Sequence, residues 1–256
     1  MIVAACFHIA ASVWMFSPDD SDKTRTDTVA AKVLTAASTK GGAGKTTLVM
    51  ALAGTLAAEG LRVAVVDADP NRAFASWSEG AYEGPPVAVR AESDEARVAE
   101  AIDELSLQAD LVLVDTAGFG NRAELLGMAA ADAVLIPCTP SRADVEQAAK
   151  TLLLAEGAAR AARRAIPARI VPSRLKHTTA VARHVLSELD EVGLPRTAAG
   201  IGDRVAFAEM TFSGRVPAGG DASAEILALI AELRDLGWIP STEFSTRAAD
   251  PVADSS

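Results

Sequence analysis

From about residue 29 onward, short apolar runs alternate with longer amphipathic stretches. The runs within 33–37, 62–66 and 111–115 contain four or five consecutive apolar or β-branched residues, which is typical of strands buried on both faces. Between such runs, apolar residues recur three and four positions apart, and this spacing predicts helices. The alternation favours the α/β class, with one doubly wound, mostly parallel sheet and helices on both faces.

The pattern places every expected element in order along one domain. The predicted strands cover residues 33–37, 62–66, 87–90, 111–115, 133–136, 166–171 and 197–201. The predicted helices cover 48–53 and the turns up to Gly60, then 71–78, 94–108, 121–131, 141–161, 176–192, 204–212 and 222–236. Two of them carry a stripe that we expect to be buried, namely Val145, Ala148, Leu152 and Ala155 in one and Val181, Val185, Leu189 and Val192 in the other.

The two ends of the chain differ in composition from the part between them. Residues 1–16 are apolar and residues 17–28 are polar and charged. We expect residues 1–28 to be an extension outside the fold, residues 29–238 to form a single domain, and residues 239–256 to form a flexible tail.

A glycine-rich segment, STKGGAGKTT at 38–47, lies between the first predicted strand and a helix. This is the context of a phosphate-binding loop, in which backbone N–H groups and the helix N-terminus face a phosphate. Lys45 is expected to reach the β- and γ-phosphates of ATP, and the Thr46 hydroxyl is expected to bind Mg²⁺. The other residues predicted to contact the nucleotide here are Lys40, Gly41, Gly42, Ala43, Gly44 and Thr47.

Acidic residues end two of the predicted strands, at the edge where parallel α/β sheets bind their ligands. Asp115 ends the run LVLVD in the manner of a Walker B strand, and we expect it near the Mg²⁺ shell. Gly118 follows it, and its backbone N–H would approach the γ-phosphate. Asp67 and Asp69 follow the strand that ends at residue 66, in the sequence VVDADP.

The loop departs from the ordinary pattern, because Thr39 stands where glycine is usual and Lys40 adds a second lysine. In this deviant form, together with VVDADP and LVLVDTAG, it resembles the ParA/MinD superfamily of P-loop ATPases. Over about residues 29–236 the chain is similar to small plasmid-type ParA and VirC-type proteins. The resemblance implies Mg²⁺-dependent ATP hydrolysis by a homodimer that encloses two ATP molecules. Its implied site residues are Lys45, Lys40 reaching the partner's ATP, Asp69 for the attacking water, Asp67 for the metal and Arg174 near the base.

Charge is unevenly distributed along the chain. The net charge is −10, yet segment 160–215 holds ten Lys or Arg against five Asp or Glu. A local basic face of this kind suits phosphate contacts without base readout, although the same arginines could be solvated residues on helix faces. We expect non-specific DNA binding, with Arg183, Arg204 and Arg215 as candidate contacts. The resemblance further implies a cytoplasmic, nucleoid-associated protein whose slow hydrolysis is stimulated by a centromere-binding (ParB-like) or relaxosome adaptor protein.

Two other functions remain open on the same fold. A MinD-like membrane cycle would need a basic amphipathic helix at the C-terminal end, but that end reads STRAADPVADSS, so a membrane partner is disfavoured. Attachment would then depend on residues 1–16. An ATP-dependent metabolic enzyme is the other alternative. Within it, a nitrogenase-type iron protein would need paired cluster cysteines near the top of the sheet, where only Cys138 is available, and a tyrosine autokinase would need a tyrosine-rich tail, which is absent. A carboxylate-amine ligase stays open.

Overall fold

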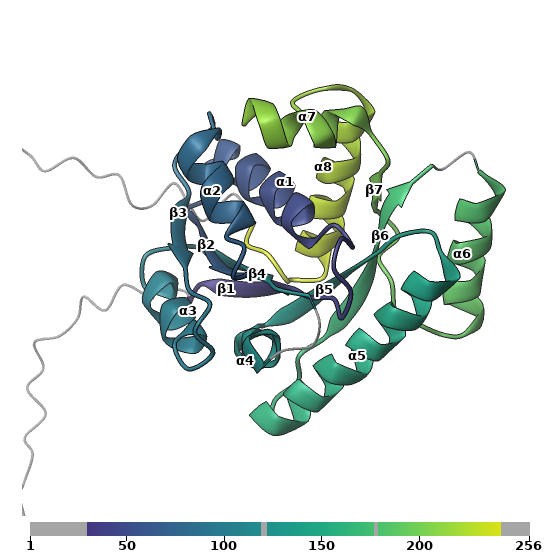
Figure 1. Cartoon of the computed structure of the whole chain (residues 1–256), viewed down its shortest axis with the longest axis horizontal. Coiled ribbons are helices and arrows are strands. Elements are labelled where there is room, and N and C mark those ends of the chain that lie inside the picture. Colours follow the sequence, from purple (N-terminus) through teal and green to yellow (C-terminus); the bar gives the residue numbers. More distant parts are fainter. Residues whose placement is uncertain (1–29, 119–121, 177–178, 242–256) are drawn as a thin grey trace, which may run out of the picture.

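The computed structural model describes residues 30–118, 122–176 and 179–241 (Figure 1). The strands are β1 (Lys32–Ala36), β2 (Val63–Ala68), β3 (Ala88–Ala91), β4 (Leu111–Thr116), β5 (Ala133–Cys138), β6 (Ala168–Leu175) and β7 (Ile201–Gly202). The helices are α1 (Lys45–Ala58), α2 (Ala73–Gly80), α3 (Val98–Ser106), α4 (Arg122–Ala130), α5 (Arg142–Ala162), α6 (Ala180–Glu191), α7 (Val205–Ser213) and α8 (Gly220–Asp235). The predicted extension 1–28 lies outside the described residues.

The strands form one seven-stranded sheet in the order β3-β2-β4-β1-β5-β6-β7, and each neighbouring pair is parallel. Figure 1 shows α1, α2, α7 and α8 on one side of this sheet and α3, α4 and α5 on the other, with α6 beside β6. Two apolar clusters fill the two sides, because successive residues of a strand point to opposite faces. Leu111 and Leu113 belong to one cluster, and Val112 and Val114 to the other. The doubly wound α/β prediction is confirmed.

Helices α5 and α6 show where the pattern located a buried face and where it did not. In α5 the stripe of Val145, Ala148, Leu152 and Ala155 is buried as predicted. In α6 the predicted stripe is wrong at both ends, since Val181 and Val192 are 57% and 60% exposed. The buried positions are instead Ala182, Val185 and Leu189. The helix begins only after Thr179, whose hydroxyl accepts the Ala182 N–H. The packing of α6 against the rest of the fold then buries a narrower face than the one predicted.

The C-terminal end of the domain extends one residue past the predicted boundary. Trp238 and Ile239 are 7% and 4% exposed and pack in the same cluster as α8.

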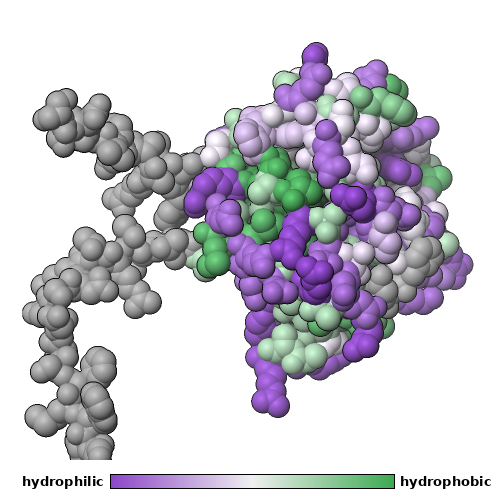
Figure 2. Space-filling model, turned by 60° about the vertical axis from the view of Figure 1, so that its left-hand side comes forward, coloured by the Kyte–Doolittle hydropathy of each residue, from purple (hydrophilic) through white to green (hydrophobic). Residues whose placement is uncertain are grey.

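Hydrophilic residues cover much of the face turned forward in Figure 2, with a group of hydrophobic residues at its left side. No helix within the described residues is long and apolar enough to cross a membrane.

Candidate functional site

A cleft of about 560 Å³ opens at the C-terminal ends of β1, β2 and β4. It therefore lies where ligands of parallel α/β sheets bind. The cleft contains most of the residues that the sequence predicted for the nucleotide, namely Gly41, Gly42, Gly44, Lys45, Thr46, Thr47, Asp69, Gly118 and Arg174. Three residues that were not predicted complete its lining, namely Pro70, Asn71 and Ala117.

The glycines give the loop its shape. Gly42 and Gly44 have φ angles of 76° and 100°, which side chains rarely adopt. Gly44 caps α1 without a side-chain hydrogen bond, so the first N–H groups of the helix remain available to an anion in the cleft. Gly118 comes so close to the loop that a Cβ there would lie 3.0 Å from the Gly41 nitrogen. The segment after β4 thus touches the phosphate-binding loop itself.

Lys45 places a buried ammonium group at the base of the cleft, with only 6% of the residue exposed. Burial lowers its pKa, while the negative charges of Asp115, Glu124 and Asp69 act in the opposite direction. A cation surrounded by carboxylates in this way is held in the site before any phosphate arrives. It supplies the positive charge that a triphosphate requires.

Asp115 has the properties expected of a metal ligand. It is fully buried, and neither carboxylate oxygen has a hydrogen-bond partner among the described residues. Burial raises its pKa to about 7, and the nearby Thr46 hydroxyl and Lys45 ammonium offset this only in part. A buried carboxylate without hydrogen bonds is unfavourable unless a cation joins it. Asp115 and Thr46 therefore fit the Mg²⁺ role predicted for them.

Asp67 lies beside Asp115 in the register of β2 and β4, but its oxygens are already engaged. One accepts the Ala75 N–H at 2.9 Å and the other accepts the Asp69 N–H at 3.2 Å. These bonds hold the start of α2 and the turn that carries Asp69 into the cleft. A metal role for Asp67 stays a prediction, and its geometry supports that role less directly than the geometry of Asp115 does.

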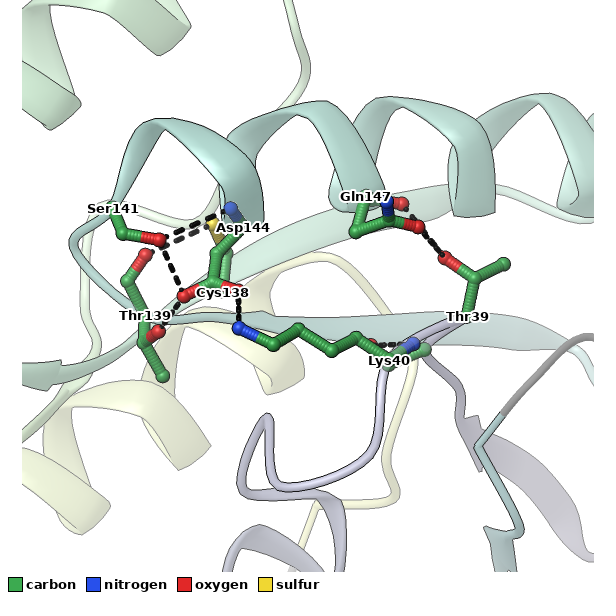
Figure 3. Close-up of polar contacts among 8 residues, drawn as sticks. Thr39, Lys40, Cys138, Thr139, Ser141, Asp144 and Gln147 are labelled. Atoms are coloured by element: carbon green, nitrogen blue, oxygen red, sulfur yellow. Dashed lines mark hydrogen bonds and ion pairs between the residues drawn. The ribbon is translucent and has the colours of Figure 1, made fainter.

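Lys40 does not line the cleft; it points along the start of α5 (Figure 3). Its ammonium forms an ion pair with Asp144, which also accepts hydrogen bonds from the hydroxyls of Thr139 and Ser141. Burial alone would raise the pKa of Asp144, but these donors hold it below its usual value. Nearby, the Thr39 hydroxyl contacts Gln147. In a single chain the second lysine of the loop is therefore bound by its own α5.

A second hollow of about 350 Å³ adjoins the cleft and shares Gly44, Thr47 and Arg174 with it. Arg174 has a φ of 53°, unusual for a residue with a side chain, at an irregularity in the β6–β7 pairing. Ile201 and Phe207 add apolar side chains to its lining. The hollow thus has the position and lining expected for the base of a nucleotide whose phosphates occupy the cleft.

The three arginines predicted to contact DNA have different surroundings. Arg204 lines the second hollow and pairs with Glu225 and Asp221 at 2.7 and 2.8 Å. Arg215 pairs with Glu83 at 2.7 Å. Arg183 is exposed on α6, and its guanidinium has no ion pair with any residue in the described ranges. Arg183 is therefore the best placed of the three for a phosphate contact.

Two buried acids beside the loop were not predicted from the sequence. Asp144 binds Lys40, and Glu124 of α4 accepts the Ser38 N–H at 2.8 Å. Glu124 is 0% exposed, although it stands in the first turn of a helix, where acids are usually at the surface. The only signal in the sequence was its place shortly after LVLVDTAG, and that signal does not reveal burial.

A parallel sheet with a glycine-rich loop after its first strand and acids ending the neighbouring strands defines a P-loop NTPase of the ParA/MinD type. The VirC1 protein family matches residues 31–225, and the chain belongs to this family. It is 34% identical over 197 residues to the protein virC1 of Rhizobium radiobacter, covering 72% of this chain and 81% of that one. It is 32% identical over 122 residues to the protein ParA of Rhizobium radiobacter, covering 48% and 55%. The chain thus spans little more than half of that ParA protein.

Solved structures share the fold at low sequence identity. An ATP complex of a McdA variant from Cyanothece has a TM-score of 0.70 at 17% identity, covering 82% of this chain and 98% of that one. The septum site-determining protein MinD of Pyrococcus horikoshii, solved with Mg-ADP, has a TM-score of 0.62 at 18% identity, covering 81% and 97%. At this level of identity the likeness establishes the fold.

Proposed function

We propose that the chain is an ATPase that binds ATP with Mg²⁺, forms a homodimer around two ATP molecules and binds DNA non-specifically. In this proposal it drives the partition or positioning of a plasmid, chromosome or relaxosome cargo. Its slow hydrolysis is stimulated by a centromere-binding or relaxosome adaptor protein. The observation that carries the proposal is the cleft, where Lys45, Thr46 and Asp69 surround one space above the buried Asp115.

Each of these groups has a distinct task in phosphoryl transfer. Loop N–H groups and Lys45 hold the β- and γ-phosphates in place, and Asp115 and Thr46 hold Mg²⁺, which neutralises charge on the phosphates when bound. Asp69 lies at the cleft wall, with its position fixed by the bond from its N–H to Asp67, and orients the attacking water. Little covalent chemistry is required, because positioning and charge provide most of the rate increase.

Lys40 links hydrolysis to dimerisation in this proposal. In the single chain it is paired with Asp144, outside the cleft. A face-to-face partner with bound ATP offers it phosphate oxygens, and the Asp144 pair must open before Lys40 can reach them. A monomer would therefore lack one of the two lysines that complete the site, so we expect its intrinsic turnover to be slow.

Light scattering tests the proposed dimer directly. The Asp69→Ala protein, in which turnover is blocked, should be a monomer with ADP and a dimer with ATP and Mg²⁺. The matched variant Lys40→Ala in the same background should bind ATP but stay monomeric. A monomer in both proteins at saturating ATP would contradict the proposal. Phosphate release that required an added metabolite would favour the metabolic enzyme instead.

A further inference from the structure

The carboxylate of Glu124 lies behind the entry to the phosphate-binding loop. Glu124 belongs to the first turn of α4 and is 0% exposed, and its Oε1 accepts the N–H of Ser38 at 2.8 Å. Helix α4 also contacts β1, because the Thr35 hydroxyl donates a hydrogen bond of 2.8 Å to the carbonyl oxygen of Gly127. The helix that follows the Gly118 segment therefore holds the strand and the loop from one side.

Glu124 brings a negative charge to this position as well as a hydrogen-bond acceptor. A neutral amide could accept the Ser38 N–H equally well, whereas burying a carboxylate is unfavourable unless charge compensates it. Burial lowers the pKa of the Lys45 ammonium, and the negative charge of Glu124, after that of Asp115, acts against this lowering. The negative charge of Glu124 is thus directed at the cation on which bound phosphates depend.

We propose that Glu124 is a positioning residue that both shapes the loop entry and weakens nucleotide binding, so that ADP leaves the cleft readily. This inference rests on the proposed binding of ATP and ADP by the loop. Bound phosphates and the Glu124 carboxylate are both attracted to the Lys45 ammonium, and they repel each other. This repulsion is stronger in a buried site than in water, because charges interact more strongly at low polarity. When the cleft is empty, the Glu124 carboxylate still compensates the charge of Lys45. Loss of ADP is therefore less unfavourable, and product release becomes faster.

Glu124→Gln separates the charge from the hydrogen bond, because its amide oxygen still accepts the Ser38 N–H. We expect dissociation of fluorescent MANT-ADP, measured by stopped flow with Mg²⁺, to slow on the order of tenfold, with a matching fall in Kd. Glu124→Asp keeps the charge and should release ADP at close to the wild-type rate.

Asp132→Asn is the matched control for the same kind of bond. The Asp132 carboxylate accepts the Val33 N–H at 2.9 Å, near the opposite end of β1 from the loop. Its neutral variant should leave ADP release unchanged, because Asp132 is remote from the phosphates.

The outcomes distinguish this inference from the proposed function. If the wild type binds ADP but Glu124→Gln releases it no more slowly, the charge has no role and the inference fails while the ATPase proposal stands. Equal slowing in Asp132→Asn would also overturn it. If Glu124→Gln does not fold, Glu124→Met, which is uncharged and similar in length, tests the charge without the hydrogen bond, and failure of both neutral variants to fold would assign the charge to stability and overturn the inference. A wild type that binds no ADP overturns both proposals.

Discussion

The nucleotide cleft and the arginine-rich segment 160–215 both gather charged side chains, but they hold them in different ways. In the cleft, Lys45 and Asp115 are buried, and the carboxylate of Asp115 lacks hydrogen-bond partners in the described part of the chain. In the segment, many arginines lie at the surface against acids of the same chain. Arg196 with Asp190 is one such pair, at 2.7 Å.

This difference shows that counting charges along a sequence is a poor guide to a binding surface. Segment 160–215 has an excess of basic residues, but acids from elsewhere in the chain, such as Glu83 and Glu225, reduce the positive charge that remains free. The cleft belongs to an acidic chain and still presents a cation to a ligand. A buried charge must be compensated by another charge, as Lys45 is by the nearby carboxylates, whereas an exposed charge is stabilised by water as well as by its neighbours.

The largest effect should come from Lys45→Ala. Removing one partner of a buried ionic contact costs about 3–5 kcal/mol, so ATP affinity should fall by roughly 1000-fold, as measured by calorimetry. Lys32→Ala, at the opposite end of β1, is the control and should bind ATP normally. Near-normal ATP binding by Lys45→Ala would mean that the phosphates bind elsewhere. The contrast between the cleft and segment 160–215 would then have no basis.

Asp115→Asn tests whether the buried carboxylate of Asp115 lowers the free energy of unfolding. Its folded pKa of about 7 lies above its unfolded value, so the wild type should lose stability as pH rises from about 4 to 7. Without Mg²⁺ at pH 8, the variant should be more stable than the wild type by about 4 kcal/mol in urea unfolding, with no difference below pH 4. The same variant should hydrolyse no ATP. A less stable variant at pH 8 would show that Asp115 is compensated within the chain.

The smallest effect should appear in the arginine-rich segment. In the Asp69→Ala background with ATP, Arg183→Ala should weaken DNA binding about two- to fivefold and reduce the salt slope by about 1. Arg204→Ala should leave that slope unchanged, because this arginine is already paired with Glu225. Filter binding over a series of salt concentrations measures both. A larger loss with Arg204→Ala would mean that its ion pair opens on DNA.

Much of the cleft followed from local patterns. The loop 38–47 and the acids at the ends of the strands were predictable, because glycine conformation and strand ends depend on neighbouring residues. The partners of those residues were not. Lys40 meets Asp144 across 104 positions of sequence, and Ser38 meets Glu124 across 86. The exposure of Val181 was likewise unpredictable, because packing decides which face of an amphipathic helix is covered.

The sequence by itself determined the class of fold, the position of the phosphate-binding loop and the identity of the residues around it. These features arise from hydrophobic period and backbone conformation, which act over a few residues. Only the tertiary structure decided which charges are buried, which are neutralised and where Lys40 points. Those outcomes depend on the distance and solvent exposure of groups far apart in the chain, and electrostatic energy is set by both.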